Sequence, residues 1–388
     1  MSVYEAILYD RSRVTTDWRC PRSRLLAYDW DGKGLATENV ALELFIGTVL
    51  HDGLAAIANG VSIDAIAEAA RTQIKRTLMA DMAAEGAALA DAEVWVNEQA
   101  ALVEGMLRGF YRHVWPSLMS RFPTIVAVEQ ELIYEHLSNA AGLTPRVLRF
   151  MSKPDLLLRD HDGGLVYLEY KSTASAKETW INSWSTQIQL HSAVRAVEAT
   201  YGEKVSQVIV QGLYKGYVAY NKQSSPFCHA YRRQGNPPFS QDSWSYSYIA
   251  GYKKFPVWEM PGGVKEWVKN MPQDVLAEQY PQVPPIFVND ELVDAFFAQR
   301  AEREVEIAIA AKGFNTLRDT EPELAREVLN LSFPQRFDQC RPSFGKACQF
   351  NQLCHGAAGR DPLAHGFVHR TPHHEPEVVA WREREQNQ

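Results

Sequence analysis

Apolar residues recur at helical spacing over much of the region from residue 38 to 117. One run follows Ser62, a residue type that caps helix N-termini well, and its apolar face comprises Ile63, Ile66, Ala67, Ala70, Ile74 and Leu78. A second helix is expected from about 91 to 114, with apolar positions at Val94, Ala101, Met106 and Phe110. The pattern predicts a helical layer over residues 38–120.

Short apolar runs of strand length follow this layer. They cover residues 125–134, 147–151, 155–158, 165–171 and 205–210. A helix is expected between the last two runs, over residues 178–200. The order of strands, helix and strand predicts an α/β core with a mixed sheet over residues 121–215.

Two of these runs are joined by Asp-Gly-Gly at 162–164, which predicts a β-hairpin. Because alternate side chains of a strand share a face, Glu169 and Lys171 should point the same way, and antiparallel pairing can bring Asp155 opposite them. Carboxylate oxygens suit Mg²⁺ or Mn²⁺, and such an ion can activate a water and neutralise charge on a phosphate. A hairpin with ordinary surface charges is the alternative.

The residues after 221 differ in composition from the α/β core. Residues 222–290 are rich in proline and aromatic residues, so we expect an irregular excursion of the same domain. A helix over about 290–312 opens a segment that extends to residue 358. Residues 359–388 are polar and contain several histidines and prolines, which favours a mobile tail; metal binding by these histidines is the alternative.

Composition narrows the class of protein. The chain has 388 residues, of which 46% are hydrophobic, as in a globular protein with a core. Its formal net charge of −7 means that contact with nucleic acid must rely on a local basic stripe. We find no signal-peptide pattern and no apolar run of about 18 residues, so a cytoplasmic protein without membrane contact is expected. There is also no Walker-type phosphate loop, so any unwinding of DNA would need a helicase or recombination partner.

An extended segment around residue 244 could bind single-stranded DNA. Its aromatic side chains alternate, which would place them on one face, and basic residues lie nearby. Bases of single strands stack on aromatic rings over a basic track. The candidate contacts are Trp244, Tyr246, Arg232, Arg233 and Lys215. The alternative is that these rings pack against the sheet and the cations are solvated.

Three cysteines, Cys340, Cys348 and Cys354, fall close together, with gaps of seven and five residues, and Cys20 lies near the N-terminus. Zinc sites usually show paired cysteines two to four residues apart, so this spacing fits an iron–sulfur cluster better. Such a cluster would join the two ends of the chain and close a loop of roughly three hundred residues, worth on the order of 5 kcal/mol by analogy with a disulfide. A zinc site and four unrelated cysteines are the alternatives, and Cys228 is left over.

Several motifs resemble a known family when taken in order. They are Cys20-Pro21-Arg22, Gly47-x-x-x-His51, Pro154-Asp155, Glu169-x-Lys171, Gln187-x-x-x-His191 and the three late cysteines. In this order they resemble the iron–sulfur members of the RecB-like branch of the PD-(D/E)XK nucleases, which include nucleases of CRISPR spacer acquisition, helicase-nuclease subunits and phage recombination exonucleases. The resemblance implies a restriction-endonuclease-like mixed sheet flanked by helices, with a C-terminal segment stapled by cysteines. It further implies one nuclease domain over residues 1–358.

The resemblance also implies roles for individual residues. His51, Asp155, Glu169 and the backbone carbonyl of Tyr170 would bind Mg²⁺ or Mn²⁺, and Lys171 would handle the attacking water. Cys20, Cys340, Cys348 and Cys354 would hold a 4Fe-4S cluster.

The roles of some further residues are less clearly assigned by the motifs. Gln187 would orient Lys171 or the DNA backbone, but its usual tyrosine partner four residues later is His191 here, so the role of residue 191 is open. Glu129 or Glu131 could reach a second metal or a water, or either could be an ordinary acid on a strand surface.

The implied function is a metal-dependent DNA exonuclease or end-processing nuclease in recombination, repair or phage DNA metabolism, leaving a 5′-phosphate and a 3′-hydroxyl. Two alternatives remain: a cluster-stapled DNA-binding or assembly subunit with incidental nuclease activity, and a zinc-stapled structural protein. Oligomeric state, cleavage polarity and strand preference do not follow from the sequence.

Overall fold

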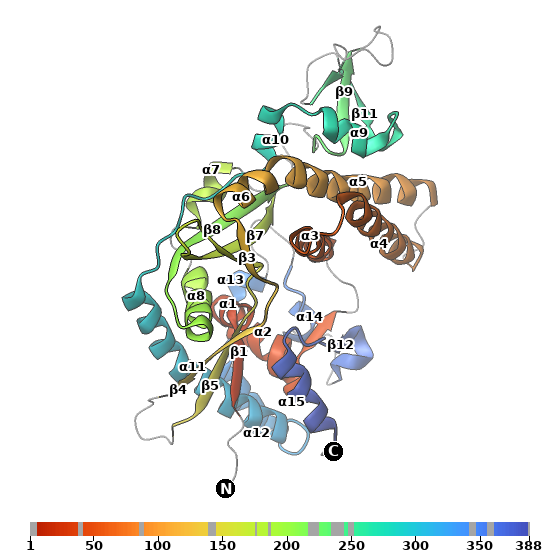
Figure 1. The fold of residues 1–388 in the computed structure, drawn as a ribbon. Coiled ribbons are helices and arrows are strands. Elements are labelled where there is room, and N and C mark those ends of the chain that lie inside the picture. The colour runs from red at the N-terminus through yellow and green to blue at the C-terminus, as the bar shows by residue number, and fades with distance from the viewer. Residues whose placement is uncertain are drawn as a thin grey trace.

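The centre of the computed structural model is a four-stranded mixed sheet with strand order β3-β6-β7-β8 (Figure 1). The structure describes residues 6–37, 42–84, 89–138, 145–174, 177–184, 188–215, 225–233, 244–246, 252–340, 347–354 and 361–386. The strands are β3 (Thr124–Val128), β6 (Leu156–Arg159), β7 (Leu165–Thr173) and β8 (Val205–Tyr214). Strand β6 pairs antiparallel with β3 and β7, whereas β7 and β8 run parallel. The expected α/β class with a mixed sheet is therefore confirmed.

The predicted hairpin joins β6 to β7. Leu156 pairs with Leu168, and Gly163 in the turn has a φ of +83°, which glycine adopts without a Cβ clash. This register sets Asp155, one residue before β6, across from Glu169 in β7.

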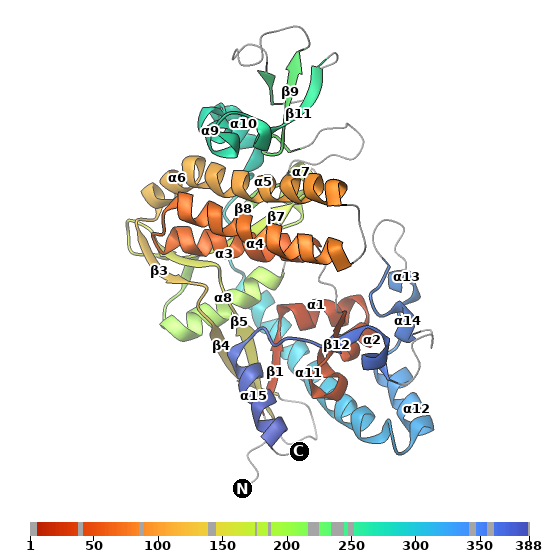
Figure 2. The same cartoon turned by 90° about the vertical axis from the view of Figure 1, so that its right-hand side faces the viewer.

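The predicted helical layer covers one face of the sheet. It consists of α3 (Leu42–Ala58), α4 (Ile63–Ala84), α5 (Leu89–His113) and α6 (Trp115–Arg121), and α3 to α5 lie side by side in Figure 2. The Ser62 hydroxyl accepts a hydrogen bond from the Ala65 N–H at 3.3 Å, as expected of a capping residue. Fully buried Leu50, Leu54 and Phe110 share one apolar core with the sheet. This core fixes the position of α3 over the hairpin.

Helices also cover the opposite face. These are α7 (Lys177–Asn182) and α8 (Ile188–Tyr201), which connect β7 to β8, and α11 (Asp290–Leu317). Buried side chains of α8, α11 and the sheet form a second apolar core, with Leu190, Val194 and Phe297 among them. The single helix expected over 178–200 is thus two helices, and residues 185–187 between them lie outside the described part of the chain.

A second sheet corrects one strand prediction. The run 125–134 is not one strand: β3 ends at Val128, Glu129 has a φ of +50°, and β4 (Leu132–Leu137) joins a different sheet. That sheet has the order β1-β5-β4, with β1 (Ile7–Asp10) parallel to β5 (Val147–Ser152) and β4 antiparallel to it. The chain turns at Glu129 because left-handed backbone cannot continue a strand.

The excursion over residues 222–290 is more regular than expected. Its described part forms a small antiparallel sheet with order β10-β9-β11, followed by short helices. The elements are β9 (His229–Arg233), β10 (Trp244–Ser245), β11 (Tyr252–Pro256), η4 (Val257–Glu259), α9 (Gly263–Asn270) and α10 (Gln273–Gln279). Helix α9 packs on α5, and the small sheet extends beyond it (Figure 1). We call β9 to β11 with α9 the outer lobe.

The two ends of the described chain pack together. The N-terminal part has α1 (Arg11–Arg19), α2 (Pro21–Arg24), η1 (Leu25–Asp29), η2 (Trp30–Gly32) and β2 (Leu35–Thr37). The C-terminal part has α12 (Pro322–Ser332), α13 (Phe337–Cys340), α14 (Asn351–Cys354), η5 (Pro362–His365), β12 (Phe367–His369) and α15 (Glu375–Gln386). No helix in the described ranges combines the length and apolarity needed to cross a membrane.

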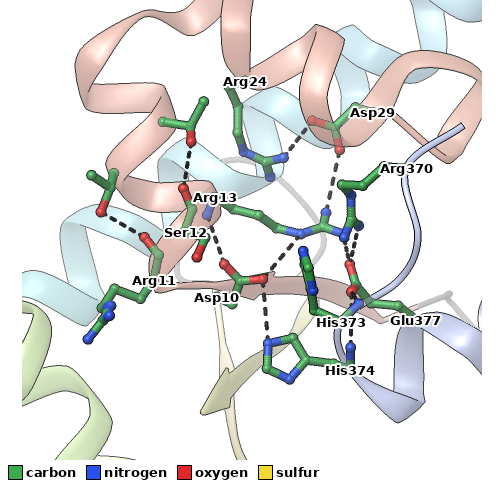
Figure 3. A network of polar contacts seen from close by, with 12 residues as sticks. Asp10, Arg11, Ser12, Arg13, Arg24, Asp29, Arg370, His373, His374 and Glu377 are labelled. Atoms are coloured by element: carbon green, nitrogen blue, oxygen red, sulfur yellow. Dashed lines mark hydrogen bonds and ion pairs between the residues drawn. The ribbon is translucent and has the colours of Figure 1, made fainter. Parts of the chain in front are cut away.

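The mobile tail expected over residues 359–388 is wrong for residues 361–386. Strand β12 pairs with β2, and Glu377 on α15 is 2% exposed. Its carboxylate accepts hydrogen bonds from Arg13 and, at 2.7 Å, from Arg370 (Figure 3). The neighbouring His374 ring contacts Glu131 at 2.9 Å. The polar composition that indicated a tail instead supplies partners for charges elsewhere in the chain.

Replacing Glu377 with glutamine should destabilise this packing. Burial alone would raise the pKa of Glu377, but Arg13 and Arg370 lower it overall, so its contribution to stability is present above the unfolded pKa of about 4.3 and lost as pH falls. Removing one partner of a buried ion pair typically costs about 3 kcal/mol or more. Chemical denaturation at pH 7 should show a lower free energy of unfolding for Glu377→Gln. This free energy should also fall less steeply than that of the wild type as the pH is lowered. The exposed Glu375→Gln provides the control, and equal stability of the two variants would contradict the assignment.

Candidate metal centre

Asp155 lies at the point where the hairpin meets the helical layer. It precedes β6, is 7% exposed, and its Oδ2 accepts a 2.6 Å hydrogen bond from the backbone N–H of Tyr170 in β7. This bond fixes one carboxylate oxygen against the neighbouring strand. The other oxygen, Oδ1, faces the imidazole of His51 on α3 at 2.8 Å.

His51 reaches the sheet because its helix is anchored on both sides of it. Leu50 and Leu54 are fully buried in the first core, while the His51 side chain is 28% exposed. Burial lowers the pKa of His51, but the Asp155 carboxylate outweighs burial and raises it overall. A metal ligand must be a neutral imidazole, so a cation at this site would compete with a proton.

Glu129 completes a group of three potential ligands. Its backbone N–H donates to the Asp155 carbonyl at 3.1 Å, and its Oε1 lies 4.0 Å from His51 Nδ1. The ligand atoms of His51, Glu129 and Asp155 all lie within 4.8 Å of one another, and no other such group of three occurs in the described residues. Lys153 Nζ contacts the second Glu129 oxygen at 2.6 Å. The strained backbone at Glu129 therefore turns an acid toward the site.

The Glu169 carboxylate is held by three donors. Tyr167 donates its hydroxyl to Oε2 at 2.6 Å, Arg11 Nη1 donates to Oε1 at 3.0 Å, and Lys171 Nζ contacts the same Oε1. Burial raises the pKa of Glu169, but Lys171 and Arg11 lower it to about 2. Glu169 is therefore a fixed anion at neutral pH, and Lys171 shares its face of β7 as expected.

The structure thus brings most of the expected residues together. Asp155 contacts both His51 and the strand that carries Glu169 and Lys171, whereas Gln187 lies outside the described residues. The Tyr170 side chain is buried in the first core, and its carbonyl remains a candidate ligand only by prediction. His191 on α8 is 7% exposed, and burial lowers its pKa.

Sequence reasoning undervalued Glu129 and missed Arg11. Glu129 was one of two acids on the strand before the hairpin, and only the turn at this residue distinguishes it from Glu131, which instead contacts His374. Arg11 carries no local motif, because its partner Glu169 is 158 positions away.

The donor set fits a divalent cation. The carboxylates of Asp155 and Glu129 are hard oxygen ligands, and they are accompanied by the His51 imidazole. Glu169 is outside this group of three but close enough to His51 to interact with it electrostatically. Mg²⁺ and Mn²⁺ prefer this kind of oxygen-rich, mixed set, whereas a structural zinc site favours thiolates and imidazoles.

The four predicted cluster ligands come from both ends of the chain. Burial raises the pKa of the Cys340 thiol, and the neighbouring Cys348 and Cys20 raise it further. Burial also raises the pKa of Cys354, to about 11, and Cys348 and Cys20 again contribute. Cys340 and Cys354 therefore both lie close enough to Cys348 and Cys20 to interact with them, although Cys20 is more than 300 residues away in sequence. Arg22 lies close enough to Cys20 and Cys354 to interact with both.

Zinc sites and iron–sulfur clusters require different distances between the thiolates that bind them. Tetrahedral zinc needs thiolates about 4 Å apart, given Zn–S bonds of about 2.3 Å. No three of the four thiols, all in the described chain, lie within 4.8 Å of one another. An iron–sulfur cluster binds each thiolate on a separate iron, which requires a wider set. The described thiols are thus too far apart for three of them to share one zinc ion.

The predicted DNA contacts lie on the outer lobe, apart from Lys215. Trp244 and Tyr246 pack on Trp267, with ring centroids 6.4 and 4.6 Å away, and the Arg232 guanidinium lies 5.8 Å from the Trp244 ring. Both aromatic side chains remain partly exposed. Lys215 follows β8 and interacts electrostatically with Glu43. For Arg233 only the backbone in β9 is described.

Comparison with known proteins gives one match over most of the chain. The family model described as the PD-(D/E)XK nuclease superfamily matches residues 12–355. No curated protein matches. A solved structure titled "Crystal structure of SSO0001" is 13% identical over 44% of this chain and 73% of that chain, with a TM-score of 0.19, which is too low to support an argument.

Proposed function

Because the chain belongs to the PD-(D/E)XK nuclease superfamily, we propose that it is a Mg²⁺- or Mn²⁺-dependent DNA exonuclease or end-processing nuclease. Hydrolysis of phosphodiester bonds follows from the family. DNA as the substrate, the exonuclease role and a place in recombination, repair or phage DNA metabolism are the proposal. The observation that carries it is the contact of His51 with Asp155 beside Glu129, together with the Glu169–Lys171 pair on the adjacent strand of the hairpin.

The side chains of the site have separate tasks in this proposal. When bound, a divalent cation would supply positive charge that polarises the phosphodiester and activates water. His51, Glu129 and Asp155 would hold it, and Glu169 on the neighbouring strand is proposed as a further ligand. Lys171 is fixed by its contact with Glu169 and would orient the attacking water. Tyr167 keeps the Glu169 carboxylate in place through its hydroxyl.

We further propose that the chain is of the RecB-like type, with a 4Fe-4S cluster held by Cys20, Cys340, Cys348 and Cys354. The electrostatic interactions of Cys340 and Cys354 with Cys348 and Cys20, and the gaps between the late cysteines in the sequence, support this. The cluster would tie α1 and α2 to α13 and α14, the elements that carry or adjoin its ligands. We also propose that residues 1–358 form one nuclease domain.

The function is tested by time courses on DNA labelled at either terminus, single-stranded and duplex, with Mg²⁺, Mn²⁺ or EDTA. The proposal expects metal-dependent shortening that starts at an end and leaves 5′-phosphates, together with no activity of Asp155→Asn. Binding of DNA without any degradation would contradict the proposal and favour the DNA-binding or assembly subunit instead. An added helicase that speeds degradation of duplex would identify the kind of partner that supplies unwinding.

A prediction concerns the outer lobe as a binding surface for single strands. Trp244→Ala should weaken single-strand affinity about tenfold, because a stacked base contributes roughly 1 to 3 kcal/mol. Register places Trp244, Arg232 and Lys253 side by side across β10, β9 and β11. Fluorescence anisotropy with a labelled oligonucleotide checks this, with Trp18→Ala on α1 as control. Equal affinity of both variants would show that the ring only packs against α9.

A further inference from the structure

Arg11 is a partly exposed cation that contacts the buried Glu169 carboxylate. It is the first residue of α1, and its side chain is 33% exposed, whereas its partner Glu169 is 6% exposed. Figure 3 shows Arg11 pointing away from the ion-pair network in which Arg13 and Glu377 take part. Arg11 therefore does not belong to the packing of the C-terminal segment.

The guanidinium has donors to spare. In the described contacts it uses only Nη1, on Glu169 Oε1 at 3.0 Å. A guanidinium carries five N–H donors in a planar fork, which can bind a second anion such as a phosphate in bidentate fashion. In the described contacts, Arg11 thus has one N–H donor fixed on Glu169, while its other guanidinium N–H groups belong to a partly exposed side chain.

Arg11 is one of the partly exposed residues around the buried carboxylates of the site. The side chains of Asp155 and Glu169 are 8% and 6% exposed, so they are reached only past the more open residues of the site. Those open residues include His51 at 28% and Lys171 at 22%. Arg11 lies among them and shares the Glu169 oxygen that Lys171 contacts.

The charges of the site also leave a role for Arg11. Each acid of the site already has a partner: Glu129 contacts Lys153, Glu169 contacts Arg11 and Lys171, and Asp155 contacts His51. Hydrolysis adds further negative charge to the phosphate in the transition state. A cation already fixed at the rim, such as Arg11, needs no reorganisation to meet that charge.

Building on the proposed nuclease function, we propose that Arg11 is a catalytic residue that binds a non-bridging oxygen of the scissile phosphodiester while it holds Glu169. The contact would orient the phosphate over the buried carboxylates and stabilise the charge that develops on it. A purely structural Arg11, which only joins α1 to β7, is the alternative.

Phosphate binding and a purely structural role for Arg11 predict different DNA affinities in the absence of metal. The test measures anisotropy of labelled duplex DNA with full-length protein in EDTA over a series of salt concentrations. The proposal expects Arg11→Ala to weaken binding about fivefold or more at low salt. It also expects the slope of log affinity against log salt to fall by about 0.9, the value for one lost phosphate contact. Arg326→Ala, which removes an equal charge from an exposed position on α12, should change neither. Identical slopes for Arg11→Ala and Arg326→Ala would overturn the proposal.

A second variant covers the case in which Arg11→Ala does not fold. Arg11→Lys keeps the charge but loses the planar fork, so the salt slope should be retained while the cleavage rate falls about tenfold or more. A wild-type cleavage rate for Arg11→Lys would overturn the proposal. The salt slope is measured without metal, so it reports on Arg11 even if the wild-type chain proves unable to cleave DNA, which would refute the nuclease function alone.

Discussion

Replacing Lys171 with alanine is expected to lower the rate of DNA cleavage about a thousandfold while the protein keeps its fold. Lys171 is the one amine that shares an oxygen with Arg11 on Glu169, and it lies on the face of β7 that carries the ionised carboxylate. Loss of a single fixed donor that stabilises transition-state charge typically lowers the rate by a factor of 10² to 10³. In this variant the attacking water would also lose the amine that orients it. The measurement is single-turnover cleavage of end-labelled DNA with saturating Mg²⁺.

The control for this variant is Lys204→Ala. Lys204 is 63% exposed and pairs with Asp290 outside the site, so its removal changes the net charge equally. It should cleave at the wild-type rate. Cleavage by Lys171→Ala at that same rate would refute the assignment of Lys171, and thermal unfolding of both variants separates loss of chemistry from loss of fold.

Replacing Cys20 with alanine is expected to remove the iron and to lower the free energy of unfolding by on the order of 5 kcal/mol, because the closed loop between the two chain ends is lost. Cys20 directly follows α1 as its C-cap, and the first residue of that helix, Arg11, contacts Glu169. The loss should therefore also loosen Arg11 and reduce cleavage. Iron and sulfide content, visible absorbance and chemical denaturation measure the effect.

The control here is Cys228→Ala. Cys228 is buried in the first core, its Sγ lies 3.4 Å from the Glu98 carbonyl, and it is not one of the four proposed cluster ligands. This variant should keep its iron and its colour. A colourless wild-type protein with stoichiometric zinc would contradict the cluster and support the zinc-stapled alternative.

Local patterns predicted the parts of the fold that depend on neighbours in sequence. The helical layer followed from apolar spacing, and the hairpin followed from an Asp-Gly-Gly turn between strand-like runs, where Gly163 adopts a positive φ. Because the register of a short hairpin is set by its turn, the placement of Asp155 opposite Glu169 could also be inferred.

Features that depend on distant partners were missed or misjudged. The break at Glu129 needs a left-handed backbone that an acid rarely adopts, so no local signal marks it. Residues of the C-terminal segment looked like a polar tail because the partner of Glu377, Arg13, lies 364 positions away. The strands of the outer lobe pair across long connections, and Arg11 meets Glu169 only after α1 is packed. The motif order nonetheless gave the correct superfamily.

The most direct test of the central claim is to locate a divalent ion in the protein. Crystals of the full chain soaked in Mn²⁺ should give an anomalous peak within ligand distance, about 2.0 to 2.3 Å, of His51, Asp155 and Glu169 side-chain atoms. Asp155→Asn crystals treated in the same way should lose the peak. An ordered Mn²⁺ bound elsewhere, with no peak between α3 and the hairpin in the wild-type crystals, would contradict the account.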